Sequence, residues 1–172
     1  AGSVTIESAQ ARVDRATALD ALNGYQGIQR GAFRLTDATG AAATIDVSDA
    51  RTLADVVDRV NSAGIGVRAA LDGDRLKLIS TTGGELRVHE VSGGRTAASL
   101  GFDAARSYSA TGELTGANLM YLTADSPLAA LNDGLGVQRL RAGTDFTINA
   151  GGSTLAVSLS DILRTDTRLE RL

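Results

Sequence analysis

The chain has 172 residues, a formal net charge of −3, 43% hydrophobic residues and no cysteine. A chain of this length can bury a sizeable core, and its composition is that of a globular protein rather than a disordered one. The lack of cysteine excludes disulfides and thiolate chemistry. The slight negative charge argues against nucleic acid as a partner. No apolar run approaches the 18 residues of a membrane-spanning helix, so membrane insertion is not expected.

An internal repeat organises the sequence. Residues 22–30 read LNGYQGIQR, and residues 131–139 read LNDGLGVQR. Each copy follows a short stretch that is predicted to be helical, at 17–21 and at 126–130, and Thr17 is the expected N-cap of the first. The Asn-Gly or Asn-Asp-Gly that comes next is predicted to end each of these helices. The chain is therefore expected to contain two copies of one structural unit.

Each copy continues as a predicted β-hairpin. Apolar and polar residues alternate at 33–36 and at 44–47, with turn residues at 37–40 between them. The same alternation occurs at 146–149 and at 155–159, around a Gly-Gly turn. Both copies are thus predicted to contain two antiparallel strands.

A helix is predicted to follow the first hairpin. Thr52 with Asp55 three residues later is a variant of the capping box, which marks a helix start. Four apolar residues then follow at the i, i+3, i+4, i+7 spacing of one helix face: Leu53, Val56, Val57 and Val60. Residues 61–64 are predicted to end the helix. In the second copy, Thr167 and Glu170 can form the corresponding cap pair, before Leu169 and Leu172.

The stretch between the copies predicts more sheet. Strands at 67–71 and 76–79 flank an Asp-Gly-Asp turn at 72–74, a strong hairpin signal. A further strand is predicted at 86–91 and a short helical turn at 96–100.

The fold class expected from this pattern is α+β, with two related hairpin-plus-helix units, largely antiparallel sheets and short helices packed on one face. The predicted division has a lead-in at 1–16, a first unit at 17–102 and a second, partial unit at 117–172. The polar, turn-rich stretch 103–116 is predicted to be a linker between the units.

Residues that could carry chemistry are few, and each has a structural interpretation. His89 alternates with apolar neighbours and is expected on the polar face of a strand, without a partner nucleophile or second histidine. The Asp-Gly-Asp at 72–74 lacks the further oxygen ligands of a calcium loop. The glycine pairs at 83–84 and 93–94 do not open a phosphate-binding strand–loop–helix unit. The grouped carboxylates are expected to be solvated: Asp46, Asp49, Asp55 and Asp58. We therefore predict no catalytic, cofactor-binding or metal-binding residues, no cofactor and no enzymatic activity.

The segment 45–61 resembles the flagellin hook IN motif. In that family a strand leads to a Thr-capped helix that ends on an apolar residue followed by asparagine, which is the pair Val60-Asn61 here. The downstream pattern is also similar at 67–69, 76–78 and 96–101. The resemblance covers roughly residues 17–101 and, in part, residues 126–172.

The resemblance implies a structural domain of an extracellular bacterial flagellar axial protein: hook-associated, filament-cap or flagellin-like. Such proteins polymerise through long terminal helices, which are not seen here. We therefore expect an outer domain of a larger secreted protein, monomeric or weakly associated by itself, whose partners are other axial subunits. The alternative is a secreted adhesin-like or glycan-binding β-rich module. Shallow glycan sites usually present exposed aromatic side chains, and Tyr25, Tyr108 and Tyr121 are the candidates available for this.

Overall fold

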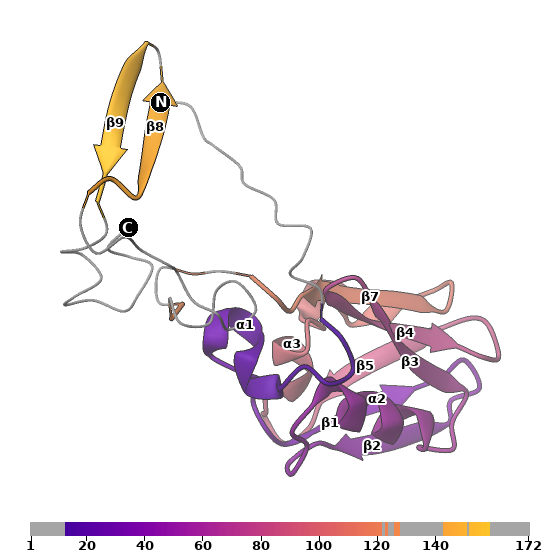
Figure 1. Cartoon of the computed structure of the whole chain (residues 1–172). Helices are drawn as coiled ribbons and strands as arrows, with labels where there is room; N and C mark the ends of the chain where they lie inside the picture. The colour runs from indigo at the N-terminus through magenta and orange to yellow at the C-terminus, as the bar shows by residue number, and fades with distance from the viewer. Residues whose placement is uncertain (1–12, 122, 124–125, 128–142, 151, 159–172) are drawn as a thin grey trace. The chain divides into compact units, whose positions relative to one another are not determined.

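The computed structural model describes residues 13–121, 123, 126–127, 143–150 and 152–158, and it divides into two compact units, Ala1–Tyr121 and Leu122–Leu172. Each unit is described by itself. The fold is α+β, with short helices and several antiparallel sheets, as the sequence predicts (Figure 1).

The larger sheet of the first unit has four strands in the order β2-β1-β5-β6. They are β1 (Ala32–Thr36), β2 (Ala42–Asp46), β5 (Leu86–Glu90) and β6 (Tyr108–Ser109). All neighbours are antiparallel, and Phe33 of β1 lies opposite Ile45 of β2. The predicted strands at 33–36, 44–47 and 86–91 are confirmed with small shifts of their ends.

The second sheet has three antiparallel strands in the order β3-β4-β7. They are β3 (Val67–Asp72), β4 (Arg75–Ser80) and β7 (Glu113–Asn118). The β3–β4 hairpin closes at the pair Asp72–Arg75, with Gly73 at a positive φ of 64° in the turn. This is the predicted hairpin.

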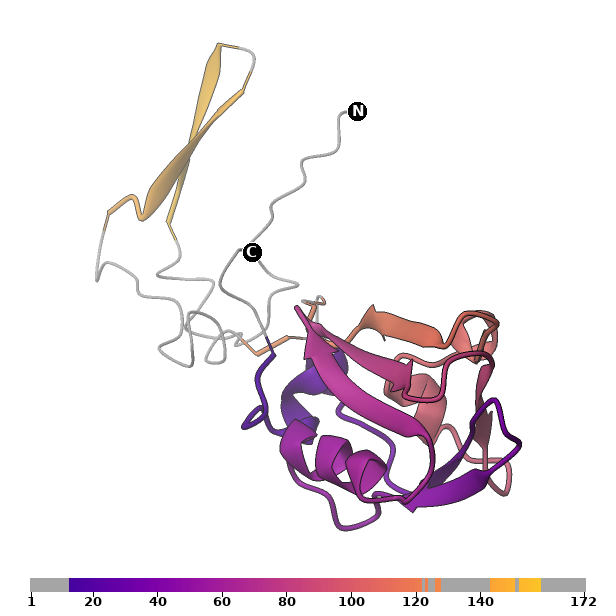
Figure 2. The ribbon, with the colours of Figure 1, turned by 90° about the vertical axis from the view of Figure 1, so that its right-hand side faces the viewer.

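Helices in the described part of the chain are short: η1 (Leu19–Ala21), α1 (Leu22–Tyr25), α2 (Leu53–Asn61), α3 (Thr96–Ser99) and η2 (Ala104–Arg106). The longest, α2, begins and ends where the sequence predicts, and all four residues of its apolar stripe are buried. Figures 1 and 2 show α2 lying beside β3. None of the helices in the described ranges is long and apolar enough to cross a membrane.

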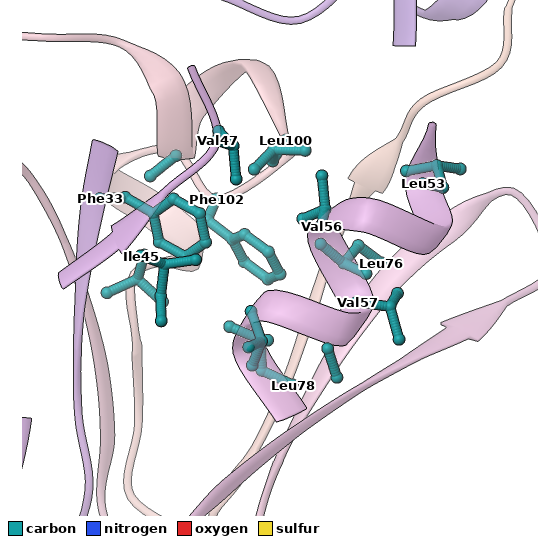
Figure 3. Close-up of a cluster of buried hydrophobic side chains, with 14 of the residues drawn as sticks. Phe33, Ile45, Val47, Leu53, Val56, Val57, Leu76, Leu78, Leu100 and Phe102 are labelled. Carbon is teal, nitrogen blue, oxygen red and sulfur yellow. The ribbon is translucent and has the colours of Figure 1, made fainter. Parts of the chain in front are cut away.

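One hydrophobic core joins the two sheets and the helices. Its side chains come from alternate positions of the strands, such as Phe33 and Leu35 of β1 and Leu76 and Leu78 of β4, all fully buried. Figure 3 shows labelled strand residues, α2 residues and a loop residue in one cluster of buried side chains: Phe33, Leu76 and Leu78 from the strands, Leu53, Val56 and Val57 from α2, and Phe102 from the loop after α3. Aliphatic residues dominate this core, as the scarcity of aromatic residues requires.

The described part of the second unit is chiefly a β-hairpin, formed by β8 (Phe146–Ala150) and β9 (Ser153–Val157). This confirms the second predicted hairpin. The repeat copy at 131–139 and the cap pair Thr167 and Glu170 lie outside the described residues. Of the helix predicted at 126–130, only Ser126 and Pro127 are described.

The N-terminal part of the first unit differs from the sequence prediction. Thr17 is not a helix cap, because the 3₁₀ turn η1 begins two residues later, and its N-cap Ala18 makes no side-chain hydrogen bond. The Thr17 hydroxyl instead exchanges hydrogen bonds with Asp14. The predicted lead-in is partly structured, since Val13 is buried in the core.

The stretch 103–116 is predicted to be a linker, but it lies inside the first unit. It contains η2, the short strand β6 that extends the first sheet and most of β7, which pairs with β4. The compact unit accordingly continues to Tyr121. The strands in this stretch were not predicted because its composition is polar. β7 is half-exposed, and Leu114 is its buried large apolar residue, so the apolar alternation of a strand is weak here.

Candidate functional site

The start of α2 is held by a complete capping box. The Thr52 hydroxyl accepts a hydrogen bond from the Asp55 amide at 3.4 Å, and the Asp55 carboxylate accepts from the Arg51 and Thr52 amides at 2.7 and 2.9 Å. These bonds satisfy N–H groups that every helix start leaves unpaired. The amide of Arg51, followed by that of Thr52, lowers the pKa of Asp55 below its ordinary value, because both bonds favour the carboxylate.

The chain before η1 supplies the remaining acceptors for this helix start. The amide of Leu53 donates to the Thr17 carbonyl at 3.1 Å, and the amide of Ala54 donates to the Arg15 carbonyl at 2.7 Å. The Arg15 guanidinium also reaches Asp58, one turn further along α2, at 2.6 Å. Residues 13–18 are therefore part of the site that positions α2.

The end of α2 is fastened to β3 by Asn61. The Asn61 carboxamide accepts a hydrogen bond from the Ala69 amide at 2.8 Å and donates one to the Ala69 carbonyl at 3.3 Å. Ala69 lies in the middle of β3, which is an edge strand of its sheet. The asparagine thus pairs with both polar groups of one strand residue and fixes the distance between helix and strand. We call this contact the Asn61 clamp.

A second fastening comes from Asp37, at the turn between β1 and β2. Its carboxylate accepts hydrogen bonds from the Thr39 hydroxyl and amide, from the Ala41 amide and, far along the chain, from the Gly66 amide. The Thr39 hydroxyl, and after it the Gly66 amide, lowers the pKa of Asp37. A side chain at Gly66 would meet Thr82 and the Asp37 carboxylate within 3 Å, so the approach requires glycine.

The side chains of Asp49 and Arg59 join the loop after β2 to the last turn of α2. Their side chains form an ion pair at 2.7 Å, and Arg59 also donates to the Asp46 carbonyl. The hydrogen bond and charge of Arg59 lower the pKa of Asp49. The Asp46 carboxylate turns back on Ser48, accepting from its hydroxyl and amide. Asp46 and Asp49 therefore hold the loop that leads from β2 toward α2.

The first repeat copy connects the ends of the unit. Asn23 takes a left-handed conformation, with φ at 53°, and its side chain donates to the carbonyls of Gly27 and Ser99. Its amide donates to the Leu119 carbonyl at 2.7 Å. Through Asn23, the first repeat copy therefore links α3 to the segment after β7.

The residues weighed for chemistry are scattered. His89 is exposed on β5, and Asp72 ends β3 at the hairpin turn. Gly83 and Gly84 follow β4, whereas Gly93 lies in the turn before α3, and all three have positive φ. Within the described ranges, no three histidine, cysteine or carboxylate side chains gather closely enough to hold a metal ion.

Sequence reasoning missed Asp37 as a fastening residue and missed the contacts of Asn23. The local signal for Asp37 is the Asp-x-Thr-Gly pattern at 37–40, which is typical of a side chain that folds back on its own turn. Its bond to Gly66, 29 residues away, has no local signal. The sequence indicates Asn61 as a signature residue of the motif, but it does not predict that Asn61 binds the backbone of Ala69.

The comparison with protein families agrees with this geometry. Residues 33–82 match the family model described as the flagellin hook IN motif, which confirms the resemblance stated above. The matched segment runs from β1 through β4 and contains the capping box, the Asn61 clamp and the Asp37 fastening. The motif indicates a flagellar-related structural protein. No curated protein and no solved structure gave a significant match.

Proposed function

We propose that this chain is a structural domain of an extracellular bacterial flagellar axial protein, of the hook-associated, filament-cap or flagellin-like kind, and that it catalyses no reaction. The observation that carries the proposal is the family match at 33–82, on a segment whose signature residues all serve the packing of α2. The side chains of Thr52, Asp55, Asn61 and Asp37 in this segment all bind backbone groups.

The structure supports a mechanical role for this segment. Asn61 joins α2 to β3, and Asp37 joins the β1–β2 turn to Gly66 just before β3, while the Thr52 hydroxyl binds a backbone amide at the start of α2 itself. Hydrogen bonds from side chains to backbone groups satisfy donors and acceptors that regular secondary structure leaves unpaired, and so hold these segments in place. We infer that the unit keeps its shape while other regions of the larger protein assemble with neighbouring axial subunits.

An antibody labelling experiment tests this proposal. Antibodies raised against the chain should label the hook, filament or filament tip of the bacterium that produces it, as seen by immunoelectron microscopy. Pre-absorption with the purified chain should abolish the label. Labelling confined to the cell surface away from flagella would contradict the flagellar role.

The glycan-binding alternative depends on accessible aromatic faces. Tyr108 is 49% exposed, but the Arg87 guanidinium lies 4.9 Å from the centre of its ring, and its hydroxyl donates to Glu85. One face of this ring is thus occupied by the protein itself. Specific micromolar binding on a glycan array, lost in Tyr108→Ala or Tyr121→Ala, would favour the alternative over the structural role.

A further inference from the structure

The outer edge of β2 carries backbone groups that point away from the sheet. β2 is the end strand of the first sheet and pairs on one side with β1 (Figure 1). The amide of Val47, just after β2, donates to the Gly31 carbonyl, just before β1, at 2.7 Å. Bonded and non-bonded residues alternate along an antiparallel pair. The amides and carbonyls of Ala42, Thr44 and Asp46 are therefore directed to the side that no described strand occupies.

Two of these three residues leave their outer groups open. The Asp46 carbonyl accepts a hydrogen bond from Arg59, so α2 covers that end of the edge. Ala42 and Thr44 have no corresponding partner within the described residues, and Thr44 is exposed. Residues 42–45 include no charged residue and no proline, and their pairing with β1 contains no bulge. The edge thus lacks the usual features that keep an added strand away.

The second sheet shows how this chain closes an edge. In β3, both backbone groups of Ala69 are bound by the Asn61 clamp, in the middle of the strand. Thr44 holds the middle position of β2, and no side chain in the described part of the chain binds its backbone in this way. The contrast between the two strands identifies β2 as an edge that remains open to pairing.

The exposed face beside this edge carries an arginine without a carboxylate partner. Arg34 of β1 is exposed, with Thr44 opposite it on β2 and His89 opposite it on β5. The diagonal residue Asp46 directs its carboxylate to Ser48 instead. Within the described ranges the Arg34 side chain forms no ion pair. Its guanidinium is therefore available to a carboxylate from another molecule.

A strand added at β2 would bring its side chains within reach of Arg34. Two strand spacings separate Arg34 from the residue that would lie opposite Thr44, a distance of roughly 10 Å. Extended arginine and glutamate side chains together span this distance, and the threonine side chain between them is short. A guanidinium and a carboxylate form strong, charge-assisted hydrogen bonds. The open edge and the available arginine therefore select the same partner, an extended segment with an acidic side chain.

We propose that β2 accepts an extended segment of another protein as a fifth strand of the first sheet. The backbone of the segment pairs with Ala42 and Thr44, and an acidic side chain on its exposed face pairs with Arg34 across Thr44. This is recognition by strand addition, in which backbone hydrogen bonds supply affinity and side chains supply specificity. The inference depends on the β1–β2 register and on Arg34, and it is independent of the flagellar assignment.

Nuclear magnetic resonance spectroscopy of the whole isotope-labelled chain tests the proposal. The probes are short acetylated peptides of alternating threonine and valine, with glutamate in place of the central threonine or, as the matched control, lysine. N-methylation along one edge of the peptide leaves its other edge free to pair with β2 and prevents the peptide from stacking on itself. The glutamate peptide should shift the Ala42 and Thr44 amides most and slow their hydrogen exchange. It should bind roughly three- to tenfold more tightly than the lysine peptide.

A variant of Arg34 separates the acidic contact from the backbone pairing. Arg34→Gln should bring the affinities for the glutamate and lysine peptides to within about twofold of each other, because the charge that distinguishes them is lost. Arg68→Gln is the matched control, since Arg68 is exposed on β3 of the other sheet, and it should retain the full preference for glutamate.

Four outcomes would overturn the proposal. The first is that the largest shifts lie away from Ala42 and Thr44. The second is equal binding of a peptide that is N-methylated along the edge meant to face β2. The third is a preference for glutamate that is absent in the unchanged protein or persists in Arg34→Gln. The fourth is protection of these two amides without peptide that grows with protein concentration, which would make a second copy of this chain the occupant.

Discussion

At the scale of single residues, the side chains that define this unit act on backbone groups far away in the sequence. Asn61 binds Ala69 of β3, and Asp37 binds the amide of Gly66. Asn61 pairs with groups on the open side of the edge strand β3, and Asp37 pairs with an amide just before that strand, so each contact satisfies backbone groups that the sheet leaves unpaired. Conservative substitutions of Asn61 or Asp37 should therefore lower the free energy of unfolding by more than the exposure of the side chain alone suggests.

Removal of the Asn61 clamp should destabilise the first unit. Asn61→Ala leaves the amide and carbonyl of the buried Ala69 without their partner, which should lower the free energy of unfolding by about 1–3 kcal/mol. Urea denaturation measures this change. The neighbouring exposed Ser62→Ala is the matched control and should have little effect. Equal stability of the two variants would show that the clamp does not contribute to folding.

Asp37 should make the stability of the unit depend on acid pH. Its pKa is lowered in the folded state by the Thr39 hydroxyl and the Gly66 amide. Between the lowered pKa and the ordinary value of about 3.9, the unfolded chain binds more protons than the folded one, so stability falls as the pH drops through this range. The stabilisation from Asp37 is fully present above that range.

The Asp37→Asn variant measures this contribution. It should be less stable than the unchanged protein at pH 7, and its stability should decline less steeply below pH 4. Asp74→Asn, in the β3–β4 turn, is the charge-matched control for thermal melts at each pH. A decline in Asp37→Asn as steep as that of the unchanged protein would exclude Asp37 as a source of the acid dependence.

At the scale of elements, the sequence predicts best where local and tertiary signals agree. The helix α2 has a capping box, an apolar stripe and a signature asparagine, and its bounds are correct. The hairpins follow from alternation and turn residues. Thr17 was misassigned because a good capping residue lies two positions before η1, where Asp14 competes for its hydroxyl. The bonds of Asp37 and Asn23 to distant residues depend on the assembled fold and leave no local pattern.

The apolar stripe of α2 offers a direct test of the core. Val57 is 3% exposed, so Val57→Asp places a carboxylate in an apolar interior and should cost about 3 kcal/mol or more. Asp58→Ala, on the next residue, removes one surface partner of Arg15 and should be tolerated. Thermal melts followed by circular dichroism distinguish the two variants. An unchanged melting temperature in Val57→Asp would contradict the packing of α2 described here.

At the scale of the whole molecule, the boundary of the first unit is set by strand pairing. The polar stretch at 103–116 has the composition of a linker, yet β7 completes the second sheet against β4. The second unit remains a predicted partial copy of the first, since its repeat segment at 131–139 lies outside the described residues.

Truncation tests this boundary. A chain ending at Tyr121 retains every described strand of the first unit and should unfold cooperatively, with a melting transition like that of the same unit in the whole chain. A chain ending at Phe102 loses β6 and β7 and exposes the β4 edge, so it should fail to give a sharp transition. Cooperative folding of the shorter chain would place the boundary at the predicted linker instead.

The Asn61 clamp has one more consequence, for the open edge of the second sheet. An edge strand such as β3 offers free N–H and C=O groups to which a strand of a neighbouring molecule can add, the usual route to edge-to-edge aggregation. At Ala69 both groups are already bound by the asparagine, in the middle of the strand. The same side chain that positions the helix therefore keeps β3 closed to uncontrolled sheet extension between neighbours.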